Sequence, residues 1–368
     1  MVSVLINNHN YGEYIGEAIK SVLAQSFEDY ELIIVDGDST DESRKIVMSF
    51  VEQYPQKITA VFKPTSGQAA AFNVGYKLSK GDIIALLDAD DFFLENKLEA
   101  IVTLHEQYDF VGHGRKFHDS DGKLQEFVVV MDDFDIRQEL LRKYGYIYTY
   151  NLITSCISMK RSLADKIFPM PEQGYMTFAD CYVKVLAQYY TNIKYIDEPL
   201  TYYRIHKRQH TEQFGSAEKI ELFCSELYNR VFEDINKKLR EERKEEIPKL
   251  TEYNLGEALK LANPNIRINK GMPLAIYGTG VYSEKVFKYV NAMGGCFSLA
   301  IDSNPNKFGM KWKKQEIVSL EQALRRRSEY DYIIIGTNNY RKEVIEVLLN
   351  AGLKEIKDFR YFVSIPND

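Results

Sequence analysis

Two kinds of apolar pattern alternate along residues 1–90, and this alternation constrains the fold more than any other feature of the chain. Short runs of apolar, mostly β-branched residues are typical of buried strands. They are Val2–Ile6, Leu32–Val35, Ile58–Phe62 and Ile83–Leu87. Segments with helical spacing separate them, including residues 67–79 and a helix expected to begin at Ser39 or Thr40 and to run through Phe50. Strands joined by helices of this length predict an α/β fold, with a mostly parallel sheet covered by helices on both faces.

Composition narrows the class of protein. The chain has 368 residues, with 47 Lys and Arg against 53 Asp and Glu, and a pI near 5.7. Because binding to a nucleic-acid backbone requires a basic surface, this balance argues against nucleic acid as a partner. No apolar run reaches the roughly 20 residues that span a bilayer, and Val2–Ile6 is too short for the core of a signal peptide. The four Cys include no CxxC pair, which is typical of a reducing compartment. We therefore expect a cytoplasmic protein, and a location at the inner face of the membrane stays open.

Three segments differ in pattern. After about residue 109 the alternation weakens, and Asp121-Gly122 is typical of a hairpin turn. Residues 216–270 are strongly charged with helical periodicity, which favours a solvated helical connector. A second alternation of strands and helices begins near residue 271. We expect domains at 1–215 and 271–368, joined by a connector at 216–270.

Carboxylates follow two of the expected strands. Asp88, Asp90 and Asp91 come directly after the fourth strand, and Asp36 and Asp38 follow the second. Because ligands of open α/β sheets bind at the carboxyl ends of strands, both groups indicate a site at one edge of the sheet. Adjacent carboxylates repel one another unless a cation offsets their charge, and oxygen ligands suit Mg²⁺ or Mn²⁺. A solvated acidic loop is the alternative interpretation.

Small residues lie between the two acidic strand ends. The segment Ser66-Gly67-Gln68-Ala69-Ala70-Ala71 opens the expected helix at 67–79. Small side chains there would let the helix N-terminus approach a ligand closely.

Four stretches stand in a fixed order along this part of the chain: VSVLINNHNY, IIVDGDSTDES, SGQAAAFNVGY and KGDIIALLDADD. In order and spacing they resemble the N-terminal half of a family-2 glycosyltransferase with the GT-A fold. The resemblance covers roughly residues 1–215. It implies a nucleotide-sugar donor, a divalent metal and transfer of a glycosyl group with inversion. The chain departs from the family pattern at Asn7-Asn8-His9-Asn10 and at Asp36-Gly37-Asp38, which leaves the identity of the base open.

The resemblance also implies roles for individual residues. Those that would bind the nucleotide or donor are Asn8, Tyr11, Asp36, Asp38, Gly67, Gln68, Asp88 and Arg204. Asp36 would hydrogen-bond the base, with Asp38 as the alternate. Asp90 would be the principal metal ligand, with Asp88 and His206 as further ligands. Arg204 or His206 would meet the diphosphate. A surface location in a basic loop is the alternative for both residues.

An inverting transfer needs a base within hydrogen-bond reach of the acceptor hydroxyl. In the family this base is a carboxylate of a Glu-Asp pair that opens a helix. Asp180 matches the Asp of that pair, and Ala179 stands where the Glu would be. We therefore predict Asp180 as the catalytic base, with an ordinary first-turn helix carboxylate as the alternative.

A glycine-rich turn marks the C-terminal segment. Gly278-Thr279-Gly280 follows an expected strand, Ser283 stands where a third glycine is usual, and Asp302 ends the next strand. This context favours a small Rossmann-like α/β domain. Nucleotide binding there and a purely architectural role both stay open.

Together these features predict a metal-dependent inverting glycosyltransferase. It would move a sugar from a nucleotide-sugar, with UDP-sugar favoured, to a glycan or lipid-linked acceptor in polysaccharide or glycoconjugate biosynthesis. Peripheral membrane association and a homo-oligomer stay open. Two alternatives are an NAD(P)-dependent sugar oxidoreductase or epimerase centred on residues 271–368, and a catalytically degenerate nucleotide-sugar-binding protein.

Overall fold

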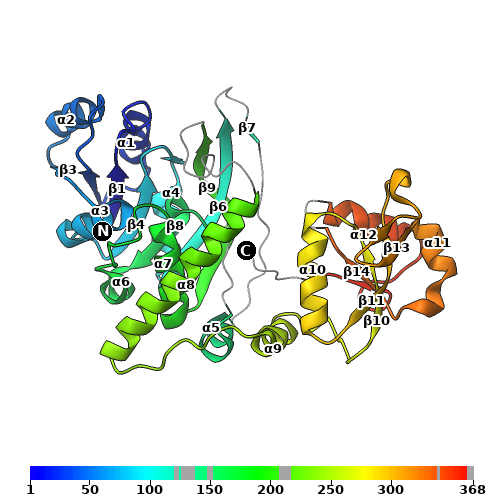
Figure 1. The fold of residues 1–368 in the computed structure, drawn as a ribbon. Helices are drawn as coiled ribbons and strands as arrows, with labels where there is room; N and C mark the ends of the chain where they lie inside the picture. The colour runs from blue at the N-terminus through cyan, green and yellow to red at the C-terminus, as the bar shows by residue number, and fades with distance from the viewer. Residues whose placement is uncertain (120–123, 126–136, 147–151, 207–216, 338–339, 363–368) are drawn as a thin grey trace. The chain divides into compact units, whose positions relative to one another are not determined.

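A computed structural model describes the chain except for residues 120–123, 126–136, 147–151, 207–216, 338–339 and 363–368 (Figure 1). The turn predicted at Asp121-Gly122 lies outside the described residues. The described residues form two compact units, one within 1–138 and 149–246 and the other within 139–148 and 247–366. None of the described helices is long and apolar enough to cross a membrane.

The first unit is built on one large mixed sheet. Its strands are β1 (Val2–Asn8), β2 (Tyr30–Asp36), β3 (Ile58–Phe62), β4 (Ile83–Asp88), β5 (Phe92–Phe93), β6 (Phe110–Asp119), β7 (Leu124–Gln125), β8 (Ile157–Lys160) and β9 (Ile193–Ile205). The order is β3-β2-β1-β4-β8-β6-β9-β5, with β7 paired to β6. The parallel arrangement predicted from residues 1–90 is confirmed, because β1 pairs in parallel with both β2 and β4. Beyond β4 the sheet is mixed, because β8 runs antiparallel to both of its neighbours.

Helices cover both faces of this sheet, as predicted. They are α1 (Ile15–Leu23), α2 (Ser43–Gln53), α3 (Gln68–Leu78), α4 (Lys97–His105), α6 (Arg161–Ile167), α7 (Ala179–Tyr190) and α8 (Ala217–Glu241), with a 3₁₀ turn, η1, at Thr154–Cys156. Alternate β1 side chains (Val2, Val4 and Ile6) join a core formed with α1, α2 and α4. On the other face Gly75 of α3 lies against Leu5.

The second helix begins later than the sequence predicted. It starts at Ser43 with Glu42 as its N-cap residue, not at Ser39 or Thr40. Ser39 instead donates its hydroxyl to Asp36, and the Ser43 amide is satisfied by the Asp41 carboxylate. The strong local acceptor in Asp41 explains why the two hydroxyl residues are not needed as caps.

The second unit is a smaller α/β unit. Its elements are α9 (Glu252–Ala262), β10 (Pro273–Tyr277), α10 (Val281–Ala292), β11 (Cys296–Ile301), β12 (Lys311–Trp312), β13 (Gln315–Val318), α11 (Leu320–Arg325), β14 (Ile333–Ile335), α12 (Arg341–Asn350) and β15 (Phe359–Arg360), and most of α5 (Arg137–Tyr144) belongs with them. The strand order is β12-β13-β11-β10-β14-β15. Only β12 is antiparallel to its partner among these described pairs.

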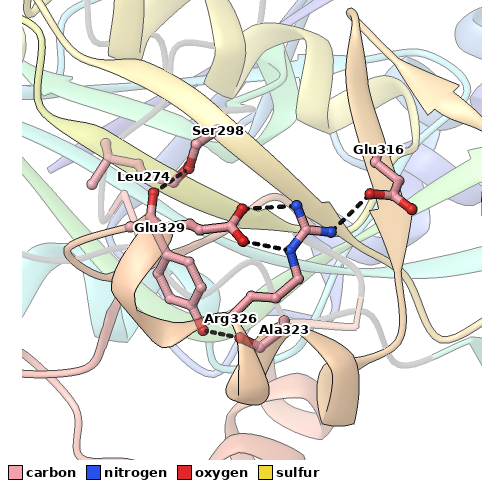
Figure 2. A network of polar contacts seen from close by, with 7 residues as sticks. Leu274, Ser298, Glu316, Ala323, Arg326 and Glu329 are labelled. Carbon is pink, nitrogen blue, oxygen red and sulfur yellow. Dashed lines mark hydrogen bonds and ion pairs between the residues drawn. The ribbon is translucent and has the colours of Figure 1, made fainter.

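An ion-pair network joins β13 of this second sheet to the turn that follows α11. Figure 2 shows the Arg326 guanidinium between the carboxylates of Glu316 and Glu329. Its Nε and Nη2 donate to the two Glu329 oxygens at 2.8 and 2.7 Å, which is a bidentate pair. The network links the turn after α11 to β13.

Candidate active site

The carboxyl ends of β1, β2 and β4 bring the predicted acidic residues to one edge of the sheet. In the register, Asn8 at the end of β1 is paired with Asp36, and its neighbour Asn7 is paired with Asp88. The central strand therefore supplies one amide side chain to each of the two acidic strand ends. The Asn7-Asn8 pair, which departs from the family pattern, is what connects them.

Asp36 lies in a hydrogen-bond network with Asn8 and Ser39. Its carboxylate accepts the Asn8 side-chain amide at 2.5 Å and both the backbone amide and the hydroxyl of Ser39 at 2.8 Å. Asn8 Oδ1 is buried and makes no hydrogen bond to any residue that the structure describes. Asp38 is exposed and has a positive φ of 67°. The buried acceptors are thus those of Asp36 and Asn8.

Asp88 carries a strongly perturbed carboxyl group. Asn7 Nδ2 and Gln68 Nε2 each donate to its Oδ1 at 2.8 Å. Burial, followed by the charges of Asp90 and Asp180, raises its pKa to about 7, although the two amide donors act in the opposite direction. A carboxylate held among other carboxylates is the environment that a bound cation stabilises.

Asp91 is turned inward and has a structural role. Its carboxylate accepts the Ser155 hydroxyl at 2.6 Å and the Arg204 backbone amide at 3.0 Å. The Ser155 hydroxyl oxygen also accepts the Asp88 backbone amide at 3.1 Å. Burial and the charges of Asp90 and Asp88 hold the pKa of Asp91 well above its usual range. Ser155 therefore fixes the loop that follows β4.

Asp90 contacts Arg204, near the end of β9, and His206, which directly follows β9. His206 Nε2 lies 3.0 Å from Asp90 Oδ2, and Arg204 Nε donates to the Asp90 carbonyl at 2.9 Å. The Arg204 guanidinium also pairs with Glu17 of α1. The rings of Tyr11 and Tyr14 pack against His206. The structure thus brings together Tyr11, Asp88, Asp90, Arg204 and His206, which the sequence analysis proposed from distant segments.

The donor atoms of this cluster suit a hard divalent cation. Within the described residues, no group of three or more His, Cys, Asp or Glu side chains is gathered as a metal site. The Asp90 and Asp88 carboxylates and the His206 imidazole nevertheless offer the oxygen and nitrogen atoms that Mn²⁺ or Mg²⁺ accepts. Burial and then the charges of neighbouring carboxylates raise the pKa of Asp88 and Asp91, and a cation at this position would offset that negative charge.

The N-terminus of α3 is occupied by the protein itself. The amides of Gln68 and Ala69 donate to the carbonyls of Met176 and Tyr175 at 2.9 and 3.2 Å. The expectation that small residues leave this helix end open to a ligand is therefore wrong. Gly67 has a φ of 111°, and a Cβ there would lie 2.2 Å from Met176 Cα. Because Gly67 has no Cβ, the segment before α7 can lie directly against it.

The Gln68 side chain links the two halves of the site. Its Nε2 donates to Asp88, and its Oε1 accepts the Ala179 amide, the first residue of α7, at 2.8 Å. One side chain thus spans from the carboxylate cluster to the helix turn that carries Asp180. Sequence reasoning placed Gln68 near a donor but gave no signal for this link.

Asp180 lies in the first turn of α7 and is buried, with 8% of its surface exposed. Lys184 Nζ lies 2.7 Å from Asp180 Oδ2 and also donates to the Leu152 carbonyl at 2.8 Å. The charge of Asp180 contributes to the raised pKa of Asp88. Sequence reasoning missed Lys184, and it also missed the buried Lys97, whose Nζ donates to the Ser155 carbonyl at 2.6 Å.

The glycine-rich turn of the second unit has its own polar cluster. Gly278 has a φ of 102°. Asp302 accepts the Thr279 hydroxyl at 2.5 Å and pairs with Lys307 at 2.8 Å. The Asp302 carboxylate is therefore already hydrogen-bonded within the chain.

Sequence comparison decides the family. The model of glycosyl transferase family 2 matches residues 3–168. An uncharacterized glycosyltransferase of Nostoc sp. is 34% identical over 221 residues, which are 59% of this chain and 68% of the relative. One of Haemophilus influenzae is 30% identical over 211 residues, 56% of this chain and 80% of the relative. The chain belongs to glycosyl transferase family 2. It is an enzyme that transfers glycosyl groups.

Solved structures show weaker similarity. S. aureus TarS 1–349 in complex with UDP aligns with a TM-score of 0.46 at 16% identity, over 71% of each chain. The mannosyltransferase PcManGT from Pyrobaculum calidifontis, in complex with GDP-Man and Mn²⁺, aligns with a TM-score of 0.45 at 17% identity, over 67% of this chain and 65% of that one.

Proposed function

We propose that this family-2 member is a metal-dependent inverting glycosyltransferase that takes a nucleotide sugar as donor and uses Asp180 as its base. The observation that carries the proposal is the Gln68 bridge. It holds the acidic cluster at the end of β4 and the first turn of α7 as one unit, with Asp88 at one end and Ala179 at the other. A transferase needs this pairing of an electrophile-activating group and a base on the two sides of the transferred sugar.

The nucleotide would lie along the ends of β1 and β2. Asp36 and Asn8 offer buried acceptors to the N–H groups of a base, and the Asn8 Oδ1 atom makes no hydrogen bond to the described residues. Tyr11 lies close to the carboxylates that follow β4. Burial of its hydroxyl, and then the charges of those carboxylates, raise its pKa. A uracil-containing nucleotide is the first candidate, and a guanine-containing one is an outcome of the test.

Asp90, with Asp88 and His206, would hold Mn²⁺ or Mg²⁺. The ion, when bound, supplies positive charge that stabilises the diphosphate as it leaves. The chain's own contribution is to orient these groups: His206 is fixed between Asp90 and the tyrosine rings, and Arg204 is fixed on the Asp90 carbonyl.

Transfer would proceed by a single displacement. The acceptor hydroxyl gives its proton to Asp180 while its oxygen forms the bond to the anomeric carbon. The bond from that carbon to the diphosphate oxygen breaks, and its electron pair stays on the diphosphate. Attack and departure on opposite faces of the sugar invert the anomeric configuration. A glycan or a lipid-linked saccharide is the acceptor class that we propose.

The second unit is proposed as a Rossmann-like domain with an architectural or acceptor-handling role. Its parallel strands and the turn at Gly278 support the architecture. The family assignment favours glycosyl transfer over the alternative of an NAD(P)-dependent oxidoreductase. The internal pairing of Asp302 with Lys307 also leaves that carboxylate satisfied.

The proposal is tested by incubating the full chain with UDP-glucose, UDP-galactose, UDP-N-acetylglucosamine and GDP-mannose, each with Mn²⁺ and with EDTA. Release of UDP or GDP is measured with water alone and with added oligosaccharides. We expect one donor to be turned over with Mn²⁺ only, the released sugar to have the inverted configuration by proton NMR, and Asp180→Asn to lose at least a hundredfold in kcat. Retention of configuration, or full activity of Asp180→Asn, would contradict the mechanism.

A further inference from the structure

Lys184 contacts the side chain that we propose as the base. It lies one helical turn after Asp180 on α7, and its ammonium is 2.7 Å from Asp180 Oδ2. Both side chains are 10% exposed, so this is a buried ion pair and not a solvated surface contact. Buried ion pairs persist only where geometry and further hydrogen bonds compensate the loss of hydration.

The ammonium is held from two sides. Its Nζ also donates to the Leu152 carbonyl at 2.8 Å, and Leu152 lies just before the η1 turn that carries Ser155. The lysine is therefore anchored to a segment outside its own helix. An anchored cation fixes the rotamer of the carboxylate that it binds more firmly than a flexible one.

The pairing distinguishes the two carboxylate oxygens. Lys184 engages Oδ2, and in the part of the chain that the structure describes no hydrogen bond or ion pair involves Oδ1. Oδ1 is thus the oxygen available to accept a proton. The other titratable groups around the pair are Cys181 on α7, Tyr228 on α8 and Asp88 on β4.

We propose that Lys184 is a positioning residue for glycosyl transfer: it holds Asp180 by Oδ2 so that Oδ1 faces the acceptor hydroxyl. The inference rests on the proposed function of Asp180. During transfer the acceptor O–H bond breaks and an Oδ1–H bond forms, while Lys184 keeps all its protons. The proton then passes from Asp180 to solvent before the next turnover.

Two single variants and their combination test this role. Lys184→Met, Asp180→Asn and the double variant are compared by kcat and KM for release of UDP or GDP from whichever nucleotide sugar of the panel is turned over. We expect Lys184→Met to lower kcat about tenfold to a hundredfold with the donor KM changed less than twofold. In the Asp180→Asn background the same substitution should change kcat less than twofold, because its target is gone.

A matched control separates positioning from general stability. Lys238 and Glu242 form an ion pair of the same spacing at the end of α8, at 2.9 Å. Lys238→Met should leave kcat unchanged. Urea unfolding of all variants reports folding directly, and the double variant removes both charges and so avoids an unpaired buried carboxylate.

The outcomes are distinct. Loss of activity in Asp180→Asn with wild-type kcat in Lys184→Met refutes the positioning role and leaves the proposed function standing. Independent effects of the two substitutions on kcat, or no coupling between them in urea unfolding, also refute it. Wild-type kcat in Asp180→Asn, or no donor turned over by the unmodified chain, refutes the proposed function and the role of Lys184 with it.

Discussion

Replacing Gln68 by Met should uncouple the two halves of the active site. Methionine nearly preserves the volume of the side chain but removes the donor to Asp88 and the acceptor for the Ala179 amide. The result should be a double loss, in stability and in turnover, from a residue that need not touch the substrate.

The magnitude follows from the two contacts. A hydrogen bond to a charged group contributes about 1.5–3 kcal/mol, and leaving a partly buried amide without an acceptor costs about 1–3 kcal/mol. We therefore expect the free energy of unfolding to fall by about 3 kcal/mol. The hydrogen bond from Gln68 lowers the pKa of Asp88, so its loss should raise that pKa further. The first turn of α7 loses its anchor, and a misplaced base should reduce kcat by about a hundredfold.

Gln25 provides a matched control. Its side chain also bridges separate segments, since it donates to the carbonyls of Ser21 and Leu94 and accepts the amide of Leu98. Gln25→Met should destabilise the fold by a similar amount in urea unfolding but leave kcat within twofold. If both variants lose the same share of kcat when measured well below their unfolding transitions, the Gln68 bridge has no special role and the reasoning is refuted.

Two further predictions concern Lys97 and Gly67, which lie near the site. Burial lowers the pKa of Lys97 to about 7. Because the unfolded chain then binds more protons than the folded one between that pKa and the usual 10.5, stability should rise with pH across this window. In urea unfolding the wild type should gain about 2 kcal/mol over Lys97→Met between pH 7.5 and 9.5, and parallel curves would contradict this. Gly67→Ala should cost more than about 2 kcal/mol and lower kcat, because φ at Gly67 is 111° and Met176 leaves no space. Gly16→Ala, in ordinary contact with Ile46, should be neutral or stabilising, and equal costs for the two would refute the argument.

The strands whose ends form the site could be predicted from the sequence alone. The apolar runs predicted β1, β2, β3 and β4 and their parallel arrangement, because each run is local and strands joined by helices of this length pair in parallel. The carboxyl ends of β2 and β4 then had to lie on one edge. Asp36 and Asp88 could be placed there without any structure.

Contacts across long sequence separations were not predictable in the same way. Gln68 bonds Ala179, and Ser155 bonds Asp91. Nothing local to these residues indicates such partners, because they depend on how segments after residue 109 fold back. For the same reason the sequence wrongly suggested that a ligand could approach the N-terminus of α3. The Gln68 amide there donates to the carbonyl of Met176, which lies far along the chain. Lys184 gave no signal because a lysine in a helix is usually solvated.

The most direct test of the central proposal is calorimetric titration of the full chain with UDP and with GDP, each in Mn²⁺ and in EDTA, together with Asp90→Ala. We expect one of the two nucleotides to bind in the presence of Mn²⁺, with binding lost in EDTA and lost in the variant. Binding of neither nucleotide, or binding that is equal with and without the metal and unchanged in Asp90→Ala, would contradict a metal-dependent donor site at the end of β4.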